Sequence, residues 1–150
     1  MALRTIMLKG RGIRDEALAA VAINPGYLLE RVSGADTVQP HSTAAASAQK
    51  IFAVENELAG SEITVAYAID DTTFFESAGP GQMVNALLAA SAAAIVRGDF
   101  LESAGDGTLR LVTADAATDE AQRNALVAVA REDVDNSSGG TEVRIKVEVL

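Results

Sequence analysis

Apolar and polar residues alternate without a break between residues 143 and 149. Val143, Ile145, Val147 and Val149 form the apolar set, and a charged side chain stands between each pair. A period of two is the spacing at which one face of a β-strand is buried. This segment is therefore predicted to be a half-buried strand. Residues 63–69 repeat the alternation and carry the same prediction.

Other short apolar runs are compatible with strands and are separated by turn residues. Asn24-Pro25-Gly26 suits a type II turn, because Pro sets the first central position and Gly accepts a positive φ at the second. Residues 104–107 are predicted to close a hairpin. Many short strands between turns predict a mainly β protein, built as a barrel or a sandwich. The predicted strands are 5–8, 17–23, 27–32, 51–54, 94–101 and 109–112.

Two segments favour helix instead. Thr118 followed by Asp119 and Glu120 is typical of a helix start, so a short helix is predicted over residues 118–124. Residues 85–92 are rich in Ala and Leu, and their propensity makes a second short helix an alternative to a strand. Residues 125–130 are apolar throughout, so periodicity leaves helix and strand open there.

The composition narrows the range of possible functions. The 150 residues carry a net charge of −9, which disfavours nucleic acid as a partner. The absence of cysteine excludes disulfides, cysteine zinc sites and thiol catalysis. No apolar stretch is long enough to span a membrane, and the first eight residues do not fit a signal peptide. Apolar content is 49% with only 4% aromatic residues, so small side chains must fill the core.

Charge is unevenly distributed along the chain. Arg4, Lys9, Arg11 and Arg14 fall within the first 14 residues, whereas all 21 acidic residues follow from Asp15 onward. Residues 1–16 are predicted to be a basic arm, and residues 17–150 the β-rich domain. Two interpretations stay open: the arm contacts a negatively charged partner or neighbouring copy, or it is a solvated first strand.

Candidate catalytic groups are few. His41 is the only histidine, which rules out a site with several histidines, and it is predicted to lie in a surface loop. Asp70-Asp71 is one acidic cluster, and Asp99 with Glu102 and Asp106 is another. Paired carboxylates serve acid–base chemistry or bind hard cations, but acids near turns are usually solvated. No nucleophile, base and oxyanion donor come together, so the chain is predicted not to be an enzyme and to need no cofactor.

A weak calcium site is a second candidate. Asp133 to Gly139 partly matches a calcium-binding loop, but Ser138 and Arg144 occupy the positions where that loop needs Gly and Glu. Gly10-Arg11-Gly12 and Gly105-Asp106-Gly107 lack the third glycine of a dinucleotide-binding motif. Neither pattern supports a ligand prediction.

Four stretches, in this order and spacing, resemble the capsid decoration (cement) proteins of tailed bacteriophages. The first is the turn and leucine run of residues 24–30 with the polar segment 37–42. The stretches after it are 51–56 with 63–68, then 94–101 leading into 105–109, and 127–132 before 143–149.

The resemblance implies a small β-barrel or β-tulip-like domain that forms a homotrimer on the outer surface of the expanded head. Its partners would be the major capsid protein and its own copies, with no membrane or nucleic acid. Assembly would take place in the cytoplasm of the bacterial host. Relatives extend an N-terminal arm along the capsid or a neighbouring subunit, and Arg4, Lys9, Arg11 and Arg14 would make that contact here.

Three alternatives remain open. The chain could be another virion component, such as a head fibre base or a tail accessory protein. It could be a β-barrel ligand-binding module of a bacterial protein, which would require a concave pocket with convergent polar groups. A carboxylate hydrolase using Asp99 or Asp106 is the third.

Val147→Asp is expected to prevent cooperative folding, because it places a charge on the predicted buried face of the last strand. A thermal melt followed by circular dichroism measures this. A soluble variant that melts cooperatively would show that the two faces of the strand are reversed.

Overall fold

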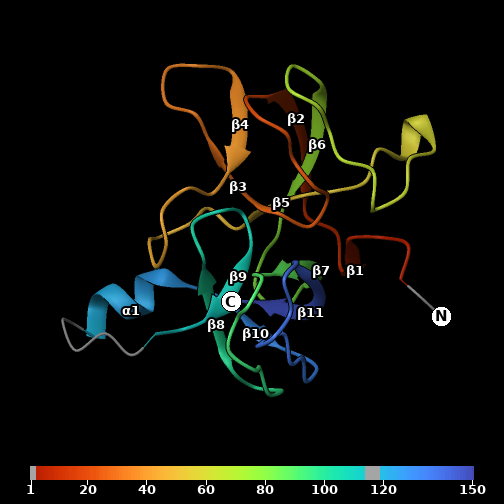
Figure 1. Ribbon diagram of the computed structural model, residues 1–150. Helices are drawn as coiled ribbons and strands as arrows, with labels where there is room; N and C mark the ends of the chain where they lie inside the picture. Colours follow the sequence, from red (N-terminus) through yellow and green to blue (C-terminus); the bar gives the residue numbers. More distant parts are fainter. Residues whose placement is uncertain (1–2, 114–118) are drawn as a thin grey trace.

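The computed structural model describes residues 3–113 and 119–150, and strands dominate them (Figure 1). One α-helix and one 3-10 turn accompany the strands in this part of the chain. The elements are β1 (Met7–Lys9), β2 (Ile13–Ala19), β3 (Leu28–Arg31), β4 (Thr37–Pro40), β5 (Ile51–Ala53), η1 (Glu57–Ala59), β6 (Thr72–Ser77), β7 (Met83–Leu88), β8 (Phe100–Ser103), β9 (Leu109–Leu111), α1 (Asp119–Ala125), β10 (Leu126–Ala130) and β11 (Val143–Val149).

The strands form two small barrels, one above the other in Figure 1. Barrel 1 is closed in the order β2-β4-β3-β5-β6. The second sheet has the order β1-β7-β11-β10-β8-β9, and a parallel bridge between Leu88 and Leu109 joins β7 to β9 and closes barrel 2. The prediction of a mainly β protein with a small barrel is confirmed.

The outer face of β3 and β5, two strands of barrel 1, packs against barrel 2. Leu29 and Ile51 belong to the apolar cluster inside barrel 1. Their neighbours Leu28 and Phe52 point the other way and belong to the cluster that fills barrel 2. Because successive side chains of a strand point to opposite faces, both faces of the two strands are apolar and buried at these positions. The barrels therefore pack as one unit.

The hairpin between β8 and β9 docks its tip on barrel 1. Gly107 donates its N–H to His41 O, and Leu28 donates to Gly107 O at 2.8 Å. Gly107 has a φ of +86°, and an added Cβ would lie 2.8 Å from Pro40 Cβ and 2.9 Å from Tyr27 Cγ. Only glycine fits here, since it alone combines this backbone angle with such a close approach.

Several predicted elements are confirmed. β11 spans residues 143–149, and Ile145, Val147 and Val149 are buried on one face. The hairpin closed by residues 104–107 is present, although β8 begins only at Phe100. α1 occupies Asp119–Ala125, close to the predicted 118–124, and residue 118 lies outside the described part. The ambiguous run 125–130 is mostly strand β10.

Other predicted elements are wrong. Residues 85–92 contain most of β7 rather than a helix, because tertiary packing in the barrel overrides their helix propensity. Residues 63–69 form no strand; a single bridge joins Tyr67 to Ile23. Two strands have no counterpart among the predicted ones: β4 at Thr37–Pro40 and β6 at Thr72–Ser77. β2 begins at Ile13, so the boundary predicted after residue 16 falls inside a strand.

Among residues 3–113 and 119–150, no helix has both the length and the apolar character needed to cross a membrane.

Gly107→Ala is expected to lower the free energy of unfolding by about 2–5 kcal/mol, through left-handed strain and the clash with Tyr27 and Pro40. Gly34→Ala is the matched control, because Gly34 has a φ of +79° with nothing within 4 Å of an added Cβ. Denaturant unfolding of both variants measures the difference. Equal losses would show that the hairpin tip is not closely packed on barrel 1.

Candidate functional site

The predicted acidic clusters do not assemble into a metal or acid–base centre. Asp70 and Asp71 are exposed, and Asp71 accepts the Ala68 N–H at 2.8 Å within its own turn. Asp99 similarly accepts the Val96 N–H at 2.8 Å. Within the part of the chain that the structure describes, no group of three or more His, Asp or Glu side chains is placed to hold a metal ion.

Glu102 and Asp106 also have structural partners. Glu102 is buried, and its carboxylate lies 2.9 Å from Arg110 Nη2 on the neighbouring strand β9. Asp106 accepts hydrogen bonds from the Thr108 N–H and hydroxyl in the β8–β9 turn. Asp135, in the segment compared with a calcium loop, accepts from the Ser137 N–H and hydroxyl. These bonds organise turns and one strand pair.

His41 is not a surface histidine, which corrects the prediction. It is buried just after β4, and its Nδ1 lies 2.8 Å from Ser103 Oγ on β8. Its Nε2 lies 3.2 Å from Ser47 O and 3.8 Å from a Glu30 carboxylate oxygen. A serine, a histidine and a carboxylate thus come together. Ser103 is fully buried, so this cluster fastens barrel 1 to barrel 2 and offers no nucleophile to a substrate.

The four basic residues of the predicted arm lie on the surface of the chain. Arg4 pairs with Glu62 at 2.8 Å, and both side chains are exposed. Arg14 lies in β2, where its guanidinium stands 5.1 Å from the centre of the Phe74 ring and pairs with Glu57 at 3.4 Å. Lys9 and Arg11 are exposed, and no ion pair of either is found in residues 3–113 and 119–150. Their contact with a capsid or neighbouring subunit stays a prediction.

From Ile6 onward, the predicted arm belongs to the folded body in the single chain. Ile6 is fully buried, and its N–H donates to a Glu55 carboxylate oxygen at 3.0 Å. β1 pairs with β7, and β2 pairs with β6 from Ile13 onward. Removing this segment would therefore take away the edge strand β1 and part of β2 in the closed barrel 1.

Arg144 is a half-buried cation whose hydrogen-bond partners are all backbone carbonyls. Its Nη1 donates to Pro25 O at 2.6 Å and to Asn85 O at 3.3 Å, and its Nη2 donates to Ile63 O at 2.6 Å. Pro25 and Ile63 belong to the loops of barrel 1, whereas Asn85 lies in β7 of barrel 2. An added Cβ on Gly26 would lie 2.1 Å from Arg144 Nη1, so glycine at that position makes room for the guanidinium.

Acidic and phenolic groups surround this arginine. Burial lowers the pKa of Arg144, and Glu142 and Glu55 oppose the shift. Glu142 accepts hydrogen bonds from Tyr27 and Asn24, both at 2.8 Å, across the same junction. Burial together with the Glu142 carboxylate raises the pKa of Tyr27 to about 12, so the phenol stays a donor at neutral pH.

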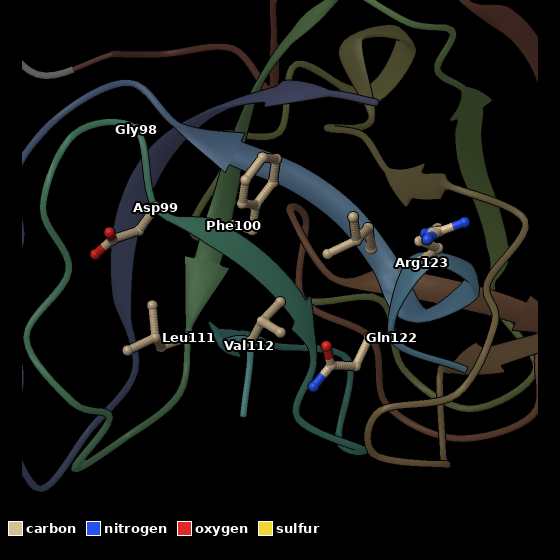
Figure 2. Close-up of a pocket in the computed structure, with 8 residues that line it drawn as sticks. Gly98, Asp99, Phe100, Leu111, Val112, Gln122 and Arg123 are labelled. Atoms are coloured by element: carbon tan, nitrogen blue, oxygen red, sulfur yellow. The ribbon is translucent and has the colours of Figure 1, made fainter. Parts of the chain in front are cut away.

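Two of the open hollows on the surface of the described residues adjoin barrel 2. One, of about 700 Å³, lies beside Arg144 and is lined by Ile63, Thr64, Asn85 and charged side chains. The other, of about 500 Å³, lies between α1 and barrel 2. Figure 2 shows the ring of Phe100 beside Leu111 and Val112 in this second hollow, with Gln122 and Arg123 from α1 at its side.

Sequence reasoning missed the residues that join the barrels. Arg144 stands at a polar position of an alternating strand, where a solvent-facing arginine is the normal expectation. Glu142 and Tyr27 are far from each other in sequence. Gly26 was the one available sign of a contact at this position, because a glycine in a turn indicates either a positive φ or the close approach of another group.

No family model matches the chain, and no curated protein matches it. Among solved structures, the fold is similar to that of the head fibre gp8.5 N base of bacteriophage phi29. The TM-score is 0.53 at 18% sequence identity, and the match covers 92% of this chain and 97% of the other. At this identity the likeness shows a common fold that includes both barrels.

Arg144→Met is expected to lower the free energy of unfolding by roughly 2–4 kcal/mol, because it leaves carbonyl groups of three segments without their donor. Arg131→Met is the matched control, since Arg131 makes only a partly exposed ion pair with Glu148 at 3.2 Å, worth about 1 kcal/mol or less. Chemical denaturation of both variants measures the difference. Similar losses would show that Arg144 contributes no more than a surface arginine.

Proposed function

We propose that the protein is a structural component of a tailed-phage virion, bound to the outer surface of the expanded head. One observation carries the proposal: the fold is similar, over nearly the whole length of both chains, to the base of a phage head fibre. The sequence resemblance to decoration proteins is a separate observation that supports the same location.

In the proposed function, the protein acts by mechanical reinforcement of the capsid. A decoration protein holds adjacent capsid subunits together against the outward pressure of packaged DNA, and it needs a persistent interface rather than turnover. A standard interface buries about 1,600 Å² in total. In a homotrimer, each additional well-placed contact increases the effective affinity by about 10²–10⁴. Modest contacts of each copy with the major capsid protein would therefore suffice for durable attachment.

The rigidity of the chain suits this role. The outer face of β3 and β5 packs against barrel 2, and carbonyl groups of both barrels are bonded to Arg144. A rigid body loses little conformational entropy when it binds, so more of its contact energy remains as affinity. The exposed Lys9 and Arg11 lie in the only basic stretch of an acidic chain, where they would orient docking on an acidic capsid surface.

A second candidate is the base of a head fibre, favoured specifically by the identity of the similar structure. A fibre base also sits on the head, but its task is to carry a distal fibre rather than to strengthen subunit junctions. The two candidates differ in what the bound protein does to the head.

The test is to mix purified protein with expanded heads of its phage that lack it. We expect saturable co-sedimentation with the heads and a higher temperature of DNA release. Binding without any gain in heat resistance would favour the fibre base. No binding to heads, at protein concentrations up to 100 times the capsid-site concentration, would contradict both.

Lys9→Glu combined with Arg11→Glu is expected to weaken head binding at least tenfold at low salt, and less at high salt. Substitution is preferable to deletion, because deleting the segment would remove the buried Ile6. The control is Arg97→Glu combined with Arg123→Glu, which makes the same change in net charge at two exposed positions of the other end of the chain. If both double variants bind the heads equally well, the basic segment is not part of the contact with the head.

A further inference from the structure

Two segments of barrel 1 lie side by side at the surface and are joined by backbone hydrogen bonds. Ile23 and Tyr67 exchange N–H···O bonds of 3.0 and 2.8 Å, and Ala19 donates to Asp71 O at 2.9 Å. The side chains of Ile23 and Tyr67 point into the barrel and are buried. We call residues 18–23 and 63–69 together the neutral face.

The neutral face gathers exposed apolar side chains. Val65 is 51% exposed and Ile69 is 62% exposed, and Leu18 and Val21 are nearly as exposed on the adjoining segment. They are four of the nine exposed large apolar residues in the described chain. Small exposed residues continue the surface between them: Ala22, Thr64, Ala66 and Ala68. Exposed apolar side chains that are grouped in this way mark an interaction surface, whereas isolated exposed apolar side chains are common on any protein surface.

Charge is absent from both segments. No charged residue occurs between Glu16 and Glu30 or between Glu62 and Asp70, although 22% of the chain is charged. The cores of protein interfaces are depleted of charge in the same way.

The ends of the neutral face carry opposite groups. At one end, Arg4 forms an exposed ion pair with Glu62 at 2.8 Å, and its side chain is 80% exposed. At the other end, Asp70 and Asp71 are both exposed. Residues 63–69 span at most about 20 Å in extended form, so the basic and acidic groups are separated along the face.

We propose that the neutral face is where copies of this chain contact one another. Each copy carries a net charge of −9, so two copies repel unless the surfaces that meet lack acidic groups. Residues 18–23 and 63–69 satisfy this condition, and the acidic groups stand only at the margin of the face. There Arg4 of one copy, which is exposed and already paired with Glu62 of its own chain, meets Asp70 and Asp71 of the next. Repeated around a closed ring, this head-to-tail contact gives the homotrimer, and the inference rests on that part of the proposed function.

The experiment is light scattering coupled to size-exclusion chromatography on three proteins: the unmodified chain, Val65→Asp combined with Ile69→Asp, and Leu58→Asp. Leu58 is 84% exposed on η1, outside the neutral face, so it is the matched control for adding an acid at an exposed apolar position. We expect about three times 15.5 kDa for the unmodified chain and the control, and 15.5 kDa for the double variant. Circular dichroism spectra of all three at a temperature well below melting should agree, because the substituted side chains are exposed in the single chain.

A double variant that keeps the oligomeric mass, or an unmodified chain that stays monomeric at every concentration tested, would overturn the inference. Arg4→Glu provides a second measurement: the dissociation constant between copies should rise about tenfold at low salt, and the effect should shrink at high salt. No change in the dissociation constant with Arg4→Glu would contradict the pairing of Arg4 with Asp70 and Asp71 between copies.

Head binding of the monomeric double variant is measured separately. Weak residual binding of the double variant to heads supports the proposed function. If none of the proteins, the unmodified chain included, binds heads, the proposed function is rejected, while the inference about the contact between copies still stands.

Discussion

The first two residues of β3 and all of β5 are buried on both faces, and the rest of the structure depends on this double burial. Leu29 and Ile51 fill barrel 1, while Leu28 and Phe52 fill the space toward barrel 2. Burying one such side chain contributes about 1.5–3 kcal/mol, so neither barrel can separate without exposing several of them to water. A chain with 4% aromatic residues obtains a core in this way, because each short strand contributes to two clusters.

Polar contacts then fix the orientation of the two barrels relative to each other, which apolar packing alone does not determine. Arg144 bonds carbonyls of both barrels, Glu142 accepts from Tyr27 and Asn24, and His41 lies against Ser103. Each of these contacts joins residues that are far apart in sequence. Together with the tight approach at Gly107, they make one rigid body from two small barrels. A protein that resists outward pressure on a shell needs this rigidity more than it needs a pocket.

The sequence predicted what local periodicity determines. The alternation at 143–149 identified β11 and its buried face correctly, and Thr118 with Asp119 and Glu120 marked the position of α1. Packing between distant segments overrode local signals elsewhere: residues 85–88 have helix propensity but lie in β7, inside a closed barrel. Residues 63–69 alternate like a strand but pair only through Tyr67, and the surplus apolar residues lie exposed on the surface. The role of Arg144 was missed and His41 was wrongly predicted to lie at the surface, because the partners of both come from other parts of the chain.

A two-barrel body with a basic first segment, a neutral face and an acidic remainder suits repeated placement on a large shell. The most direct measurement of the proposed function is a cryo-electron microscopy reconstruction of heads from the phage proposed to encode this chain, compared with heads of a deletion mutant. The account predicts extra density on the outer surface of the complete heads, at symmetry-related positions, into which the two barrels fit as one body. Identical reconstructions of the two heads, or density for this chain only on the tail or inside the shell, would contradict it.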